Sequence, residues 1–223
     1  MSKDAEALKA RATGGDIRVH TVVSAAWLCP EIPLHLVTEA CALWRAGEAE
    51  LAALGLVDPY WAFAWAGGQV LARYLLDHPE EVGGRRVLSF GAGGGLEAIA
   101  AMRSGAAEVV ALEIDPLAIE AIRLNAALSQ VQVEPLLLDV LADDQLGAFD
   151  LVLAGDVLYD GELAVRANAW LRRRAEAGAR VLIGDPGRGH VPPGLEVLAS
   201  YEAPADVDTR GEILRTAKVY RLL

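Results

Sequence analysis

Val87–Gly95 reads VLSFGAGGG, and this stretch decides the fold of the chain. An apolar run with β-strand character ends in glycines, and helix-forming residues follow at once from Leu96 to Met102. A strand that turns through glycine into a helix presents backbone N–H groups, and the absence of Cβ atoms lets a bound group approach closely. The turn therefore predicts an adenosyl-type ligand, with a purely structural strand-to-helix turn as the alternative.

Two registers fit these glycines. Counted from Gly93, residues 93–98 satisfy the loose G-x-G-x-x-A pattern of dinucleotide-binding sheets. Counted from Gly91, the glycines give the G-x-G-x-G pattern of methyltransferases. The second register is favoured because it puts the first glycine directly after the strand, where a tight turn needs it. The first register stays open as a dinucleotide-binding alternative.

Strands and helices alternate around and beyond the glycine turn. Strands are predicted at 86–90, 108–112, 133–138, 149–154 and 180–183, and helices at 96–104, 116–128 and 162–175. Such βα units imply a mostly parallel sheet with helices on both faces. After a loop at 185–193, a short helix or strand at 195–201 and a final strand at 213–222 predict an antiparallel ending. This α/β architecture is Rossmann-like, and its ending is typical of class I methyltransferases.

An N-terminal extension, 1–58, is expected to pack on a methyltransferase domain, 59–223. Two prolines favour an extended path from Cys29 to Leu36. Apolar residues at helical spacing then predict a helix from Leu36 to about Leu54, and a second helix is predicted from Gly68 to Asp77. The most aromatic stretch of the chain, PYWAFAWAGG at 59–68, lies between these two helices.

Composition limits the classes of partner. The formal net charge of −11 argues against nucleic acid and is compatible with a basic peptide or protein, although an acidic surface also aids solubility. Cys29 and Cys41 form no C-x-x-C pair and predict neither a disulfide scaffold nor a metal site. No apolar signal core and no run long enough to span a membrane is present. We expect a cytoplasmic protein, a monomer, without a membrane partner.

Ligands of a doubly wound sheet bind beyond the carboxyl ends of its strands, so the residues that follow each strand are the candidate site. Glu113, about twenty residues after the glycines, is placed to accept hydrogen bonds from both ribose hydroxyls. Asp139 can accept from the exocyclic amine of adenine, or cap a turn. Asp156 follows apolar strand residues and a glycine, so it points out of the sheet at the ligand edge. The candidate cofactor contacts are Trp65, Ser89, Gly91, Ala92, Gly93, Gly95, Glu113, Asp139, Val140 and Gly155.

The fifth strand is followed by Asp185-Pro-Gly-Arg188. Asp185 and Arg188 are candidates for substrate binding, together with Asp156 and Tyr159. The turn chemistry of Asp-Pro-Gly explains the same residues without any function, so this alternative stays open.

From about Pro30 to its C-terminus, the chain resembles the electron transfer flavoprotein β-subunit lysine methyltransferases, a branch of the seven-β-strand protein methyltransferases. The most specific matching segments are 59–69 (PYWAFAWAGGQ), 72–77 (ARYLLD), 155–159 (GDVLY) and 183–188 (IGDPGR), and 30–36 (PEIPLHL) matches the family's N-terminal segment.

The resemblance implies roles for single residues. Asp156 and Tyr159 match the family's D-x-x-Y motif, which faces the acceptor lysine, and they are the candidate catalytic residues. Trp65 matches a tryptophan near bound S-adenosylmethionine, and Gly91, Gly93, Glu113 and Gly155 match cofactor-contacting positions. Ser89 departs from the family, which usually has an acidic residue there that helps to hold the methionine amine of the cofactor. Weaker anchoring of that amine is expected.

The resemblance thus implies an S-adenosylmethionine-dependent protein-lysine N-methyltransferase that acts on the β subunit of electron transfer flavoprotein. Methyl transfer needs a neutral amine, and neutral lysine at pH 7 costs roughly 4–5 kcal/mol. Our hypothesis is that Asp156 captures and aims the ammonium, while the sulfonium favours its deprotonation. Two alternatives remain: a class I methyltransferase for a ribosomal protein or a small amine such as nicotinamide, and a non-catalytic or NAD-binding Rossmann domain.

Overall fold

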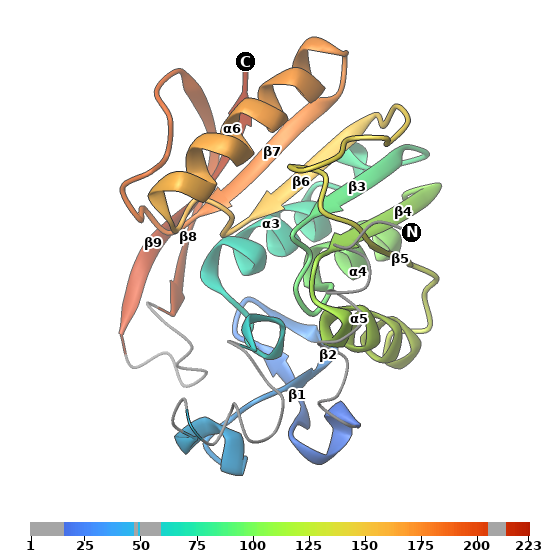
Figure 1. Cartoon of the computed structure of the whole chain (residues 1–223), viewed down its shortest axis with the longest axis vertical. Coiled ribbons are helices and arrows are strands. Elements are labelled where there is room, and N and C mark those ends of the chain that lie inside the picture. The colour runs from blue at the N-terminus through green and yellow to red at the C-terminus, as the bar shows by residue number, and fades with distance from the viewer. Residues whose placement is uncertain (1–15, 47–48, 50–58, 205–212) are drawn as a thin grey trace.

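The computed structural model describes residues 16–46, 49, 59–204 and 213–223. Its centre is a seven-stranded sheet in the order β5-β4-β3-β6-β7-β9-β8, and a separate pair of strands, β1 and β2, lies beside it (Figure 1). The strands of the large sheet are β3 (Arg86–Phe90), β4 (Glu108–Glu113), β5 (Glu134–Leu137), β6 (Leu151–Gly155), β7 (Arg180–Asp185), β8 (Leu195–Pro204) and β9 (Leu214–Leu222).

The pairing of these strands confirms the expected mixed sheet. β3 pairs in parallel with both β4 and β6, and β6 pairs in parallel with β7. The last two strands run the other way, because β9 pairs antiparallel with both β7 and β8. Residues 195–201, for which a helix or a strand was expected, belong to β8. The fold is therefore a mostly parallel α/β sheet with an antiparallel ending.

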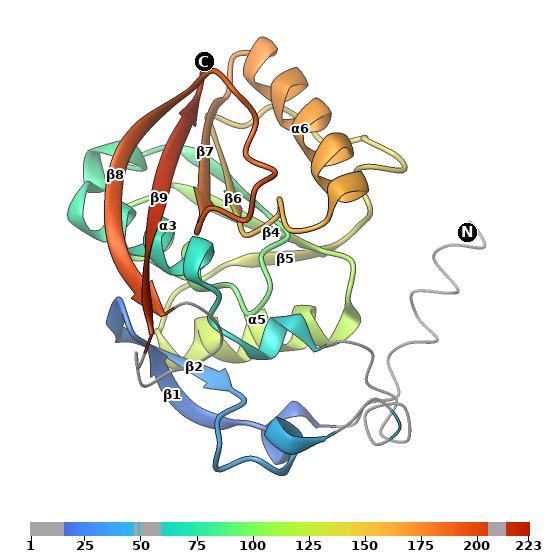
Figure 2. The ribbon, with the colours of Figure 1, turned by 90° about the vertical axis from the view of Figure 1, so that its left-hand side faces the viewer.

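Helices cover both faces of the sheet, as Figure 2 shows for α3 and α6 on opposite sides. The described α-helices are α3 (Ala66–Asp77), α4 (Leu96–Arg103), α5 (Pro116–Leu128) and α6 (Gly161–Glu176). α3, α4 and α5 bury apolar side chains on one face. On the other face, Trp170 of α6 is fully buried and stacks on Phe90 of β3, with ring centroids 4.9 Å apart. Burial on both faces explains why the central strands are almost continuously apolar.

The N-terminal extension packs on these helices. A single 3₁₀ turn, η1 (Ile17–Val19), leads into β1 (Val22–Ala26), which pairs antiparallel with β2 (Cys29–Leu36). The extended path expected for 29–36 is thus confirmed. Ile32, Leu34 and Leu36 of β2 are buried in one apolar cluster with residues of α3, α4 and α5.

The helix predicted from Leu36 to Leu54 is wrong for residues 36–46. Leu36 ends β2, and the 3₁₀ turn η2 (Ala42–Arg45) follows it; Ala49 is helical, and residues 47–48 and 50–58 lie outside the described residues. The apolar spacing reflects burial, since Leu43 packs in a cluster with Trp61 and Leu117. Tertiary contacts of this kind can produce a helical period in an irregular segment.

α3 approaches the sheet through glycines. Its N-terminal residues Gly67 and Gly68 lie against Gly184 at the end of β7 and Gly155 at the end of β6. A Cβ atom added to Gly155 would lie 2.8 Å from the Cα atom of Gly68, closer than real Cβ contacts allow. The 3₁₀ turn η3 (Tyr60–Ala62) precedes α3, and η4 (Pro79–Glu81) follows it. The glycine contact brings the first turn of α3 to the carboxyl ends of β6 and β7.

No helix in the described part of the chain combines the length and the apolar character that a membrane span requires.

Candidate active site

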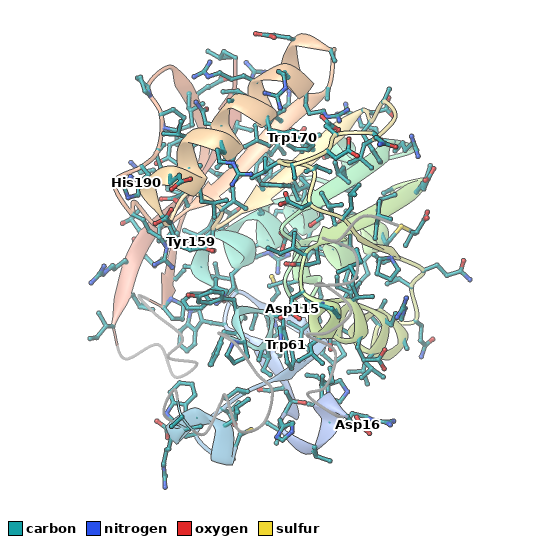
Figure 3. The ribbon with its side chains drawn as sticks, viewed as in Figure 1. Asp16, Trp61, Asp115, Tyr159, Trp170 and His190 are labelled. Atoms are coloured by element: carbon teal, nitrogen blue, oxygen red, sulfur yellow. The ribbon has the colours of Figure 1, made fainter. Side chains whose placement is uncertain are left out.

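A cavity of about 580 Å³ opens at the carboxyl ends of β3, β4 and β6, and we call it the main cavity. Its volume falls within the range of small-molecule sites. The loops after several strands and the aromatic stretch before α3 form its walls. Figure 3 labels three of its lining residues, Trp61, Asp115 and Tyr159, which come from separate segments around the middle of the molecule. The predicted position of the site, beyond the carboxyl ends of the strands, matches this cavity.

The glycine turn forms the floor between β3 and α4. Gly91, Gly93 and Gly95 have φ angles of +64°, +53° and +85°, a region that side chains other than glycine rarely adopt. Gly91 directly follows β3, which agrees with the methyltransferase register. The carbonyl of Gly94 accepts a hydrogen bond from Asn125 Nδ2 at 2.8 Å. Asn125 Oδ1 in turn accepts from the backbone N–H of His35 at 2.7 Å, so the N-terminal extension holds this turn in place.

Glu113 ends β4 and joins it to the glycine turn. Its Oε1 accepts a hydrogen bond from the backbone N–H of Gly93 at 2.8 Å, and its Oε2 accepts from that of Ile114 at 2.8 Å. Desolvation raises the pKa of Glu113, and these backbone donors lower it. The carboxylate is therefore held in one orientation on the wall of the main cavity.

Asp139 follows β5, and its carboxylate caps a turn. Its Oδ1 accepts from the backbone N–H groups of Leu141 at 3.0 Å and Ala142 at 3.3 Å. Asp139 and Val140 nevertheless line the main cavity, together with the apolar Leu138 and Leu141. Asp139 thus caps a turn and also lies at the cavity wall, and its contact with the adenine amine stays a prediction.

Asp156 directly follows β6 and has a φ of +54°, in the left-handed region that is strained for residues other than glycine. Its Oδ2 accepts a hydrogen bond from the backbone N–H of Gly68 at 2.9 Å, at the N-terminus of α3. Burial raises the pKa of Asp156 to about 6, although Arg188 and the backbone N–H groups of α3 act in the opposite direction. The strained backbone aims a poorly hydrated carboxylate into the cavity.

Arg188 brings a positive charge to Asp156. Its Nη2 lies 3.3 Å from Asp156 Oδ1, and its guanidinium carbon lies 5.5 Å from the ring centroid of Trp65. Asp185 holds this loop, because its Oδ1 accepts from the backbone N–H groups of Gly187 at 2.6 Å and Arg188 at 3.0 Å. The Asp-Pro-Gly sequence therefore forms a structural turn, and this turn also places Arg188 at the cavity.

Aromatic rings surround this ion pair. Tyr60 lies with its ring centroid 5.9 Å from that of Trp65 and 5.8 Å from that of Tyr159. Tyr60 and Tyr159 are each about half exposed. Ring faces that flank a carboxylate form a favourable environment for an organic cation.

The structure gathers most of the predicted site residues. The main cavity is lined by Trp65, Gly91, Gly93, Glu113, Asp139, Val140, Gly155, Asp156, Tyr159 and Arg188. Ala92 lines a smaller recess that adjoins the main cavity. Ser89, Gly95 and Asp185 line neither: Ser89 is fully buried in β3, Gly95 caps α4, and Asp185 is buried below its turn.

Several residues at the site were not predicted from the sequence, among them Glu97, Tyr60 and Trp61. Glu97, on the first turn of α4, lines the smaller recess and is buried, with 4 % of its surface exposed. In the sequence, Glu97 stands among helix-forming residues and was not singled out. Its place two residues after the glycine turn could have indicated a carboxylate close to a ligand. Tyr60 was included only in an aromatic stretch. Trp61 also lines the cavity, and its indole N–H has no hydrogen-bond partner in the described part of the chain.

Within residues 16–46, 49, 59–204 and 213–223, no group of three or more His, Cys, Asp or Glu side chains is placed to hold a metal ion. The cavity offers fixed carboxylates at Glu113 and Asp156, apolar walls and a cation-binding aromatic rim. Such a site can hold a nucleoside on one side and an amine on the other.

Comparison with known proteins identifies the family. Residues 70–159 match the family model described as ribosomal protein L11 methyltransferase (PrmA). The solved structure of ribosomal protein L11 methylase from Lactobacillus delbrueckii subsp. bulgaricus is similar in fold, with a TM-score of 0.51 and 21 % identity over 70 % of this chain and 77 % of that chain. These two similarities support a methyltransferase fold.

The more extensive similarity is to the electron transfer flavoprotein beta subunit lysine methyltransferases. The Rattus norvegicus protein of this name is 42 % identical over 205 residues, which cover 89 % of this chain and 79 % of the relative. The Xenopus laevis protein is 46 % identical over 170 residues, which cover 76 % of this chain and 68 % of the relative. The ribosomal-protein alternative is less well supported, because the L11 model matches only residues 70–159. The dinucleotide alternative is less well supported because the relatives that match most of the chain are methyltransferases. By this similarity over most of its length, the chain belongs to the electron transfer flavoprotein beta subunit lysine methyltransferase family, and it is a methyltransferase.

Proposed function

We propose that this enzyme transfers a methyl group from S-adenosylmethionine to a lysine side chain of the β subunit of electron transfer flavoprotein. The observation that carries the proposal is the Asp156–Arg188 ion pair beneath Trp65, on the same cavity as the Glu113 carboxylate. One cavity thus offers a nucleoside-type contact and a cation site. The names of the relatives support the choice of the protein substrate.

The residues of the main cavity fit S-adenosylmethionine. Glu113 at the end of β4 offers a carboxylate for the ribose hydroxyls, and the apolar Leu138, Val140 and Leu141 offer a wall for adenine. The glycine turn next to Glu113 leaves room for close approach, since Gly91 and Gly93 carry no Cβ atom. When bound, this cofactor supplies an electrophilic methyl group on a sulfonium. With adenine beside Leu138 and Val140 after β5, the strand order β5-β4-β3-β6 would put the reacting end of the cofactor near Asp156.

The acceptor lysine fits where Arg188 now lies. Arg188 shows that a cation can sit within ion-pair distance of Asp156 and over the face of Trp65. A lysine ammonium that entered between the half-exposed Tyr60 and Tyr159 would replace Arg188 as the partner of Asp156. Asp156 Oδ1 would then orient it. The net charge of −11 favours approach of a basic protein surface.

Burial also makes Asp156 a stronger base than an exposed aspartate, while it stays a much weaker base than a lysine amine. An exposed aspartate is a weak base at neutral pH, whereas burial raises the pKa of Asp156 to about 6. Its carboxylate is therefore mostly ionised at pH 7 and still able to accept a proton from the ammonium at Oδ1. This adds a proton-accepting role to the capture and aiming of the ammonium.

The test uses the full chain, the purified flavoprotein β subunit and S-adenosylmethionine with an isotopically labelled methyl group. We expect label on a lysine of the β subunit. Asp156→Asn should lower the rate by about 100-fold, within the usual range for a lost acid–base group. Asp143→Asn, which neutralises an exposed carboxylate, is the matched control and should keep the wild-type rate.

Two results would contradict the proposal. Label on another protein or a small amine in a lysate, but none on the β subunit, would refute the substrate. A wild-type rate in Asp156→Asn would refute the role of Asp156. Thermal unfolding of Asp156→Asn shows whether a loss of activity comes from a loss of folded protein.

A further inference from the structure

Glu97 carries a buried carboxylate that has no role in the proposed function. Glu97 lies on the first turn of α4, with 4 % of its surface exposed. The only side chain in the described residues that donates a hydrogen bond to it is Ser89, whose Oγ lies 3.3 Å from Glu97 Oε1. No arginine, lysine or histidine of these residues forms an ion pair with it. A buried carboxylate without a positive partner is costly, so its position calls for a ligand.

Glu97 faces a recess that continues the main cavity. This side recess has a volume of about 50 Å³, enough for a small polar group, and it shares Gly91, Gly93, Gly155 and Asp156 with the main cavity. The carboxylate spans the space between two glycines. A Cβ atom on Gly155 would lie 3.3 Å from Glu97 Oε1, and one on Gly68 would lie 3.3 Å from Oε2. The two glycines thus let the carboxylate pack closely between α3 and β6, where it lines the side recess.

The other carboxylates of the cavity are already engaged. Glu113 accepts hydrogen bonds from the backbone N–H groups of Gly93 and Ile114, and Asp156 is paired with Gly68 N–H and Arg188. Glu97 therefore remains the carboxylate available to a ligand cation at the junction of β3, β6 and α4.

We propose that Glu97 binds the α-ammonium group of the methionine part of S-adenosylmethionine. The inference rests on the proposed function and assigns one more residue to the same site. With adenine at β5 and ribose at Glu113 of β4, the amino-acid end reaches β3 and β6, where the side recess lies. Ser89 Oγ donates a hydrogen bond to the Glu97 carboxylate and so helps to orient it.

The electrostatics agree with this placement. Burial raises the pKa of Glu97 to about 8, and the charges of Asp156 and Glu113 add to this effect, whereas Ser89 lowers it. A bound ammonium would supply the opposite charge that the described part of the protein lacks at this point. Binding and ionisation of Glu97 are then coupled.

The experiment measures binding by calorimetry, independently of turnover. The probes are S-adenosylhomocysteine and its deamino analogue, in which hydrogen replaces the α-amino group. The full-length variants are the wild type, Glu97→Gln, the matched control Glu176→Gln on the exposed end of α6, and the double variant Ser89→Asp with Glu97→Gln. Removal of the ligand's α-amino group and removal of the Glu97 charge, separately and together, form a double-mutant cycle that measures their interaction.

We expect the wild type and Glu176→Gln to bind S-adenosylhomocysteine at least tenfold more tightly than the deamino analogue. In Glu97→Gln this preference should disappear while affinity for the analogue is unchanged, and the double variant should regain it. A preference that persists in Glu97→Gln overturns the assignment, and so does an equal loss for both ligands, which would indicate a structural role. If the wild type binds neither ligand, the proposed cofactor itself is wrong and this assignment falls with it.

Discussion

Replacing Gly184 with alanine tests how α3 is seated on the sheet. Gly184 lies at the end of β7, and its φ is not in the left-handed region, so an alanine there would suffer no backbone strain. The new methyl group would instead point into α3. It would meet the carbonyl of Gly67, with the carbonyl carbon only 2.8 Å away, and it would lie 2.8 Å from Leu71 Cγ.

The size of the effect follows from these distances. The carbonyl carbon of Gly67 must move away by at least about 0.6 Å to reach an ordinary contact of 3.4 Å. Gly67 belongs to helix α3, whose backbone cannot yield alone, so the whole first turn must shift. Overpacking of this kind typically costs 1–3 kcal/mol, which corresponds to a fall in Tm of roughly 3–10 °C for a chain of this size. The hydrogen bond from Gly68 N–H to Asp156 would lengthen with the shift.

Urea denaturation and thermal unfolding measure the stability of Gly184→Ala, and calorimetry measures its affinity for S-adenosylhomocysteine. Gly83→Ala is the matched control. It adds a methyl group at an exposed position whose nearest neighbour, Pro79 O, is 3.4 Å away, and it should change stability by less than about 0.5 kcal/mol. If Gly184→Ala unfolds at the wild-type midpoint, close packing of α3 on β7 does not hold the site together.

Stability should also depend on pH through Glu97. Its folded pKa of about 8 lies above the ordinary value of 4.5, so the folded state holds this proton more tightly, and the free energy of unfolding falls as the pH rises from about 4.5 to about 8. The loss attributable to Glu97 is at most about 5 kcal/mol, and it should be absent in Glu97→Gln; parallel curves of urea-unfolding free energy against pH for the two proteins would contradict this. Asp160 caps α6, where its Oδ1 accepts from the backbone N–H groups of Glu162 and Leu163. Asp160→Ala should therefore lower the free energy of unfolding by about 1 kcal/mol, and Asp160→Asn by less, in the same urea assay; equal stability of Asp160→Ala and the wild type would show that the cap contributes nothing.

Local patterns were sufficient for most of the fold. The strands at 86–90 and 108–112 and the helix at 116–128 have the expected bounds within one residue, because a buried strand and an amphipathic helix each leave their own period in the sequence. The same strand ends located Glu113 and Asp156, since a parallel sheet brings its carboxyl ends together. Residues 36–46 were misjudged as helical because contacts with Trp61 and Leu117, distant in sequence, produced their apolar spacing.

The glycine stretch at 87–95 by itself determined the turn from strand to helix, because positive φ angles after a strand are a local property of glycine, and it predicted an adenosyl-type site there. It did not determine how the site is charged. Ser89 suggested a missing anchor, and only the tertiary structure placed the buried Glu97 carboxylate 3.3 Å from the Ser89 hydroxyl, facing Gly68 and Gly155 from two other elements. Which carboxylate is free and which is engaged depends on contacts between residues far apart in the chain, and those contacts exist only after α3, α4 and β6 have packed together.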